Sequence, residues 1–143
     1  MRADDAGLDC PICAKHRGLG PLVGPRIYAD DRVVVSHRAE GSLGYAFIET
    51  RRHVDHLAEL TEDEARVIGI VRSRLAQGLA AELAVEHVHA MVAGLGVEHF
   101  HEHVFVRHRG TPAVIGWVEP WPAAPTGDIQ ALVRRLAVHL GRV

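Results

Sequence analysis

Three histidines near the C-terminal side of the chain, His99, His101 and His103, are each separated by a single residue. Successive side chains of a β-strand point to opposite faces, so these three would share one face, with attachment points roughly 7 Å apart. A neutral imidazole supplies a nucleophilic nitrogen, and a protonated one donates to phosphate oxygen. The spacing therefore indicates phosphate chemistry on a strand. Solvated surface histidines and metal ligands of the His-x-His kind remain as alternatives.

The chain has only two cysteines, Cys10 and Cys13, in a Cys-x-x-Cys arrangement. In a reducing compartment such a spacing indicates a metal-binding or redox-active pair of thiols rather than a structural disulfide. Tetrahedral zinc needs two further ligands, and His53, His56 and His99 are candidates. Two reduced cysteines with a purely structural role are the alternative.

Several elements are needed to position these groups. Alternating or β-branched segments predict five strands, at residues 26–29, 32–36, 45–49, 86–92 and 97–107. A long helix should begin at the capping box Thr61-Glu62-Asp63-Glu64, because an apolar stripe at three- and four-residue steps follows it. Thr126 or Asp128 would cap a terminal helix, after an ordered loop at 110–127 that contains both tryptophans. The fold class is α+β, an antiparallel sheet of about five strands with one long and one or two shorter helices.

Length, charge and composition limit the number of domains, the binding partners and the location that we expect for the chain. The chain has 143 residues, which fits a single domain over 1–143. The net charge of −2 means that the chain lacks the excess of positive charge that attracts nucleic acid or an anionic membrane. The first residues are too acidic and polar for a secretory signal, and no apolar run approaches the length of a membrane span. We therefore expect a cytoplasmic protein that binds neither nucleic acid nor membrane.

Together these motifs resemble the histidine-triad (HIT) family of nucleotide hydrolases and transferases, in its zinc-containing Cys-x-x-Cys branch. The resemblance rests on the ordered set Cys10-Pro11-Ile12-Cys13, Asp30-Asp31-Arg32, Arg51-Arg52-His53, Thr61-Glu62-Asp63-Glu64 and the alternating histidines. It covers about residues 9–110, with 111–143 as a C-terminal extension. It implies a HIT-like fold.

The resemblance also implies residue roles. His101 matches the nucleophile that attacks the α-phosphate of a nucleoside phosphate and forms a covalent nucleotidyl-histidine, and His103 matches the histidine that contacts this phosphate. Cys10, Cys13, His53 and His99 match the ligands of a structural zinc. His99 could instead act with the catalytic pair as a phosphate contact, but the metal role is favoured. The family further implies a nucleotide or nucleoside phosphate as substrate, no organic cofactor and a homodimer.

The sequence departs from the family pattern at several positions. Glu102 stands where the family has an apolar residue, and His37 stands where an acidic residue commonly contacts ribose. Leu95 and Ala93 replace an amide side chain each. These changes affect nucleoside recognition more than phosphate chemistry.

We assign substrate contacts to His37, Val35 and Arg107, with a strand-end surface position as the alternative for Arg107. Two other functions stay open for the chain. One is a non-enzymatic nucleotide-binding or sensor module, and the other is a zinc-dependent hydrolase with a catalytic metal on the three alternating histidines.

Overall fold

The computed structural model describes residues 9–141, which form one five-stranded antiparallel sheet with helices on both faces. The strands lie in the order β1-β2-β3-β5-β4. Their bounds are Arg26–Ala29 (β1), Val33–His37 (β2), Tyr45–Thr50 (β3), Val85–Met91 (β4) and His101–His108 (β5). The helices are α2 (Pro11–His16), α3 (Glu62–Glu82) and α4 (Ile129–Leu140), with a 3-10 turn η1 (Leu57–Glu59).

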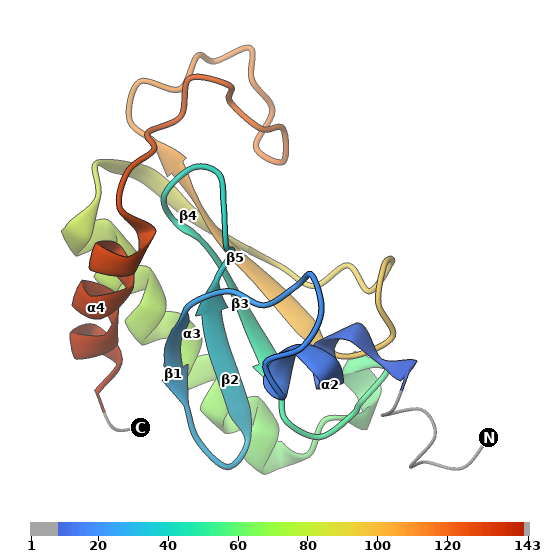
Figure 1. Cartoon of the computed structure of the whole chain (residues 1–143). Coiled ribbons are helices and arrows are strands. Elements are labelled where there is room, and N and C mark those ends of the chain that lie inside the picture. The colour runs from blue at the N-terminus through green and yellow to red at the C-terminus, as the bar shows by residue number, and fades with distance from the viewer. Residues whose placement is uncertain (1–8, 142–143) are drawn as a thin grey trace.

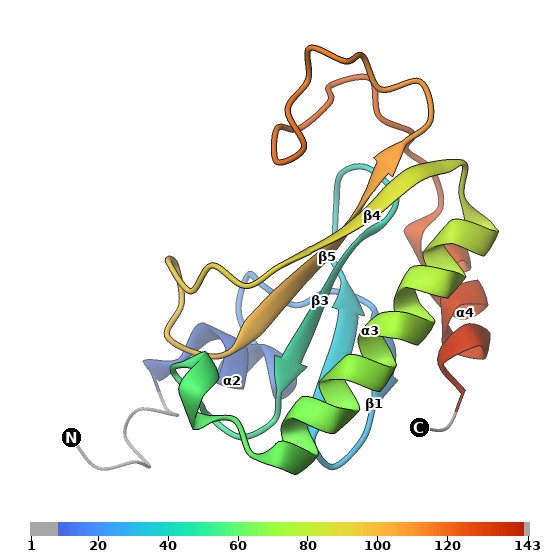
Figure 2. The same cartoon turned by 180° about the vertical axis from the view of Figure 1, so that it is seen from behind.

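The two long helices cover one face of the sheet, and Figure 2 shows α3 running across the strands with α4 beside it. Between helices and sheet lies the apolar core, which includes Val33, Ile48, Leu75, Val104 and Leu136. Figure 1 shows the short helix α2 on the opposite side, near one end of the sheet. The remainder of that second face, the open face, carries the odd-numbered side chains of β5.

The helix ends follow the predicted capping chemistry. The Thr61 hydroxyl accepts from the Glu64 amide, and the Glu64 carboxylate accepts from the Thr61 amide, which completes the capping box of α3. Of the two candidates for α4, Asp128 is the cap, because its carboxylate accepts from the Ala131 amide. Buried leucines of α4 pack in the same core as α3, so the C-terminal segment contributes to that core.

Two elements differ from the sequence-based expectation. The strand expected over 97–107 begins only at His101, because residues 97–100 turn: the His99 amide donates to the Val97 carbonyl and the Phe100 amide to the Val54 carbonyl. The helix α2 falls partly in a region expected to be a loop, and its N-cap is a thiol, Cys10 Sγ, which accepts from the Cys13 amide.

Of the helices in the described part of the chain, none has the length and apolarity needed to cross a membrane.

Candidate functional site

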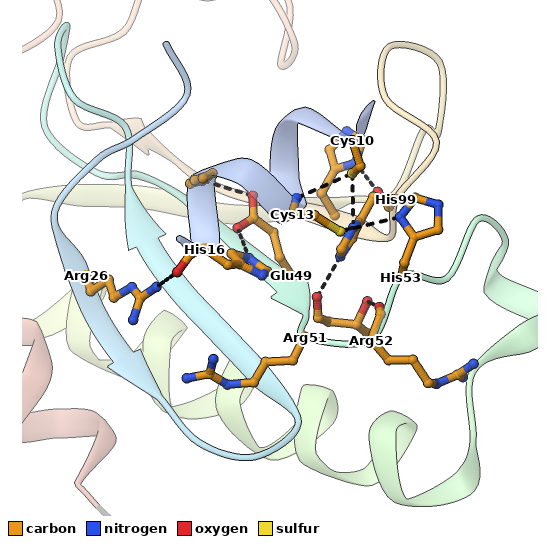
Figure 3. A network of polar contacts seen from close by, with 12 residues as sticks. Cys10, Cys13, His16, Arg26, Glu49, Arg51, Arg52, His53 and His99 are labelled. Carbon is orange, nitrogen blue, oxygen red and sulfur yellow. Dashed lines mark hydrogen bonds and ion pairs between the residues drawn. The ribbon is translucent and has the colours of Figure 1, made fainter. Parts of the chain in front are cut away.

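Four side chains from three distant segments meet at one end of the sheet (Figure 3). Cys10 is the N-cap of α2 and Cys13 lies within that helix, while His53 follows β3 and His99 precedes β5. Cys10 Sγ lies 3.3 Å and Cys13 Sγ 3.4 Å from His99 Nδ1, while Cys13 Sγ lies 3.6 Å from His53 Nδ1. The structure thus brings together the four residues predicted as zinc ligands. His56, also considered from the sequence, is exposed and lies outside this group.

The donor set fits a tetrahedral zinc ion. With Zn–S near 2.3 Å and Zn–N near 2.0–2.1 Å, a tetrahedron separates sulfur from nitrogen by about 3.6 Å, and the distances above agree with that edge. Burial and the neighbouring Cys10 thiol raise the pKa of the Cys13 thiol to about 11, so this thiol needs a cation nearby to ionise at neutral pH. Four protein ligands leave no open position, which is the pattern of a structural site.

The outer nitrogens of both histidines in the cluster are also bonded. His99 Nε2–H donates to the Thr50 carbonyl at 2.6 Å, and His53 Nε2 lies 3.0 Å from Asp55 Oδ1. These contacts turn each Nδ1 lone pair toward the cysteines. His99 is 1% exposed, and burial lowers its pKa to about 4, so the ring is neutral. Both ring nitrogens of His99 are therefore engaged, which favours the metal role over a phosphate contact.

The other two histidines of the triad lie together on the open face of the sheet. His101 Nδ1–H donates to the backbone carbonyl of His99 at 2.7 Å, and the His101 and His103 ring centroids are 5.3 Å apart. Both side chains are half-buried. The expected row of three imidazoles on one strand face is thus a pair on β5, with the third ring directed into the metal cluster before the strand begins.

A tyrosine that the sequence reasoning missed holds His103. Tyr45 Oη lies 2.7 Å from His103 Nδ1, and the two rings meet edge to face with centroids 5.8 Å apart. Burial raises the pKa of Tyr45, so its hydroxyl stays protonated. Burial lowers the pKa of His103, and the neighbouring His101 lowers it further while Glu49 opposes them. The alternation of Tyr45, Phe47 and Glu49 on one side of a predicted strand was the available signal.

A buried ion-pair network, also unforeseen, lies beside His101. Glu49, which pairs with His101 across β3 and β5, accepts from Lys15 Nζ at 2.9 Å and lies 3.1 Å from His16 Nε2 (Figure 3). The Lys15 ammonium also lies 4.7 Å from the centroid of the Phe47 ring. Burial alone would raise the pKa of Glu49, but His16 and Lys15 outweigh it and lower that pKa. The network therefore holds α2 against the open face, because Lys15 and His16 belong to α2 and Glu49 belongs to β3.

Two predicted substrate contacts do not fit the structure. Val35 is fully buried in the core under the helices. His37 is also fully buried: its Nδ1–H donates to the Arg38 carbonyl, and its Nε2 accepts from the Gly44 and Tyr45 amides. Neither side chain is available to a substrate. The spacing that suggested His37 as a ribose contact gave no information about which face of β2 the side chain occupies.

Arg107, the third predicted contact, holds a loop in place. Its guanidinium donates to the Ile115 and Pro112 carbonyls, and its Nε lies 3.4 Å from Glu86 Oε2.

Glu102, which departs from the family pattern, is buried on the helix side of β5 and forms a bidentate ion pair with Arg72 of α3, at 2.6 and 2.7 Å. A paired carboxylate at this position is compatible with burial.

Comparison with protein-family models and with curated proteins found no match to the sequence. Comparison with solved structures gave clear similarities. A zinc-bound histidine triad family protein from Mycobacterium smegmatis has a TM-score of 0.70 and 20% identity, over 94% of both chains. A hypothetical histidine triad nucleotide-binding protein from Sulfolobus tokodaii has a TM-score of 0.66 and 17% identity, over 87% of both chains.

A third structure, a HIT family hydrolase from Clostridium thermocellum, has a TM-score of 0.56 and 17% identity. The similarity covers 75% of this chain and 97% of that one. The sheet order, the three helices and the clustered cysteines and histidines described above agree with these similarities. The chain therefore has the α+β fold of the histidine-triad proteins, with a Cys2His2 group suited to zinc.

Proposed function

We propose that the chain is a nucleotide hydrolase or nucleotidyltransferase that acts on the α-phosphate of a nucleoside phosphate through His101. The observation that carries this proposal is the bond from His101 Nδ1–H to the His99 carbonyl. This bond fixes the tautomer and leaves the Nε2 lone pair free for attack on phosphorus. The nucleotide-binding and hydrolase descriptions of two structural neighbours support the same assignment.

In this mechanism His101 Nε2 attacks the α-phosphorus, and the leaving group departs with the electrons of its bond to phosphorus. The result is a covalent nucleotidyl-imidazolium that water or another acceptor then resolves. The His99 carbonyl supports the positive charge that forms on the ring, because it still accepts from Nδ1–H.

His103 has the complementary role. When the Tyr45 hydroxyl donates to Nδ1, the proton of the neutral ring is on Nε2, and this N–H can donate to an α-phosphate oxygen. The lowered pKa of His103 keeps the ring in this neutral form near pH 7. One imidazole is thus a nucleophile and its neighbour a hydrogen-bond donor.

Zinc bound by Cys10, Cys13, His53 and His99 would be structural. It would fix the segment before β5 whose carbonyl orients His101, and no catalytic step needs it. Within residues 9–141, His101 and His103 belong to no group suited to a metal ion, which disfavours the alternative of a zinc-dependent hydrolase.

Substitution of His101 by Ala tests the proposal. We expect nucleotide hydrolysis to fall by at least about 10³-fold, because the covalent route is lost. Hydrolysis at near the wild-type rate would contradict the catalytic role. A nucleotidyl adduct on His101, trapped by denaturation at alkaline pH, where the phosphorus–nitrogen bond survives, and located by mass spectrometry, would exclude the alternative of a non-enzymatic sensor.

Other expectations from the sequence stay predictions. These are the homodimer, a cytoplasmic location and the absence of nucleic-acid partners.

A further inference from the structure

A cavity of about 300 Å³ lies on the open face, beyond His103 in the direction of β5. Tyr45 and Phe105 line it from the sheet, and Arg38 lines it from the loop between β2 and β3. Trp117 and Trp121, the only tryptophans of the chain, line it from the segment after β5. Figure 1 shows this segment, coloured orange, projecting past the end of the sheet.

The aromatic rings of the cavity are nearly parallel. The Tyr45 and Phe105 ring planes differ by 12° with centroids 5.3 Å apart, and those of Phe105 and Trp117 differ by 8° with centroids 6.4 Å apart. Trp117 remains 53% exposed although it is in an ordered segment. Nearly parallel rings, with Trp117 exposed at the edge of the set, form a platform on which a flat aromatic group can stack.

The guanidinium of Arg38 gives the cavity a positive charge. The Arg38 guanidinium lies 4.5 Å from the Tyr45 ring centroid, and its Nη2 donates to Ser42 Oγ at 2.8 Å. Its Nε is buried and has no hydrogen-bond partner among the described residues. The positive charge of the guanidinium attracts an anionic group without a direct bond to Nε. The cavity thus suits a flat ring that carries negative charge.

The wall that carries the tryptophans is fixed rather than loosely placed. Arg107 donates to the Pro112 and Ile115 carbonyls, and the Leu43 amide donates to the Pro125 carbonyl at 2.9 Å. These bonds tie both ends of the segment to the sheet and to the β2–β3 loop. A site that is already formed costs less conformational entropy on binding.

The order of side chains along β5 decides which part of a substrate would reach the cavity. His101, His103 and Phe105 follow one another on the same face, and Tyr45 contacts both His103 and Phe105. In phosphoryl transfer the attacking and leaving atoms lie roughly in line on opposite sides of phosphorus. With His101 as the attacking group and His103 at the phosphate, a leaving group opposite His101 would extend along β5 toward Phe105 and the cavity.

We propose that this cavity is a subsite for the leaving group, and that it selects leaving groups with a planar aromatic ring and a negative charge. The inference rests on the proposed function of His101. In the step concerned, the Nε2–phosphorus bond forms and the phosphorus–oxygen bond to the leaving group breaks. The electron pair stays on that oxygen, so a phosphate leaving group departs as an anion toward Arg38 without needing a proton.

Two probes with the same adenylyl group separate the subsite from the chemistry. ADP releases inorganic phosphate, whereas diadenosine triphosphate releases ADP, which carries an aromatic ring. We expect Trp117→Ala to lower kcat/KM for diadenosine triphosphate about tenfold more than for ADP, a typical loss for one stacking contact. Val114→Ala is the matched control, because Val114 is 85% exposed on the same segment and does not line the cavity; it should leave the ratio of the two rates unchanged.

A binding measurement gives an independent readout. In a His101→Ala, Trp121→Phe protein, which cannot turn over the probe and keeps Trp117 as its only tryptophan, ADP should quench the Trp117 emission saturably. Adding Arg38→Gln should weaken this binding several-fold. Quenching that is absent or insensitive to Arg38 would overturn the inference, as would an unchanged rate ratio in Trp117→Ala. If the wild type cleaves neither probe and forms no His101 adduct, the proposed function fails and the leaving-group assignment with it.

Discussion

At the scale of single residues, backbone and hydroxyl groups orient each histidine of the triad differently. A carbonyl orients His101, a tyrosine hydroxyl orients His103, and the Thr50 carbonyl turns His99 toward the cysteines. The sequence shows three equivalent imidazoles at equal spacing. The proposed division into a nucleophile, a donor and a metal ligand depends, for His103 and His99, on Tyr45 and Thr50, which are far away along the chain, so the spacing alone could not predict it.

Tyr45→Phe tests the positioning of His103. Loss of the hydroxyl lets the His103 proton move to Nδ1, and we expect kcat to fall about tenfold with KM little changed, equivalent to about 1.4 kcal/mol at the transition state. Tyr28→Phe is the control, because the hydroxyl of Tyr28, on β1, donates to Asp30 in the turn that follows rather than to a histidine. Steady-state kinetics on both variants make the comparison. Equal losses in the two proteins would show that the effect is only structural.

At the scale of elements, the sequence predicts those whose signals are local. The capping box of α3, the Asp128 cap of α4 and strands β1 to β4 all lie close to their expected positions. The misplaced start of β5 and the unexpected helix α2 have a common physical reason. Both segments carry predicted zinc ligands, Cys10, Cys13 and His99, and contacts within that cluster override the local preference for strand or loop.

The connection between β2 and β3 should depend on pH through His37. Burial lowers the pKa of His37, although the bond to the Arg38 carbonyl opposes this. At pH values between the ordinary histidine pKa, near 6.5, and the lower pKa of the folded state, His37 binds more protons in the unfolded chain than in the folded protein. The stability that neutral His37 contributes is therefore complete above about pH 6.5 and is lost as the pH falls through the lowered pKa.

His37→Gln isolates this contribution. The variant should be less stable than wild type by about 1–2 kcal/mol at pH 7.5, because bonds to the Gly44 and Tyr45 amides are weakened. The difference should shrink as the pH falls below 6.5. Urea unfolding at a series of pH values measures it, and any acid loss of metal affects both proteins alike. A difference that is constant with pH would contradict the assignment.

At the scale of the whole molecule, the Cys2His2 cluster joins the N-terminal helix, the segment after β3 and the segment before β5. The ion-pair network of Glu49 with Lys15 and His16 attaches the same helix to the sheet. The sequence resemblance predicted the four ligands. It did not predict the ion pairs, because they depend on how α2 lies over β3.

Removal of the metal should therefore destabilise the entire fold. With a strong chelator we expect the Tm to fall by roughly 10 °C, as for the loss of a few kcal/mol in a domain of this size. Cys13→Ser should begin at a lower Tm and respond little to the chelator. Calorimetry with elemental analysis of the same samples would check both. A loss of activity without a change in Tm would instead indicate a catalytic metal.

The position of His99 has a practical consequence for anyone who purifies this protein. Its ring belongs to the Cys2His2 cluster, whereas its carbonyl holds the imidazole of His101, the proposed nucleophile, so a single residue connects the two proposed centres. A preparation that is only partly loaded with zinc would contain two populations with different turnover. If the proposed function is correct, specific activity should then vary from batch to batch with metal stoichiometry, and rates normalised to protein concentration alone would underestimate the rate of the fully loaded protein.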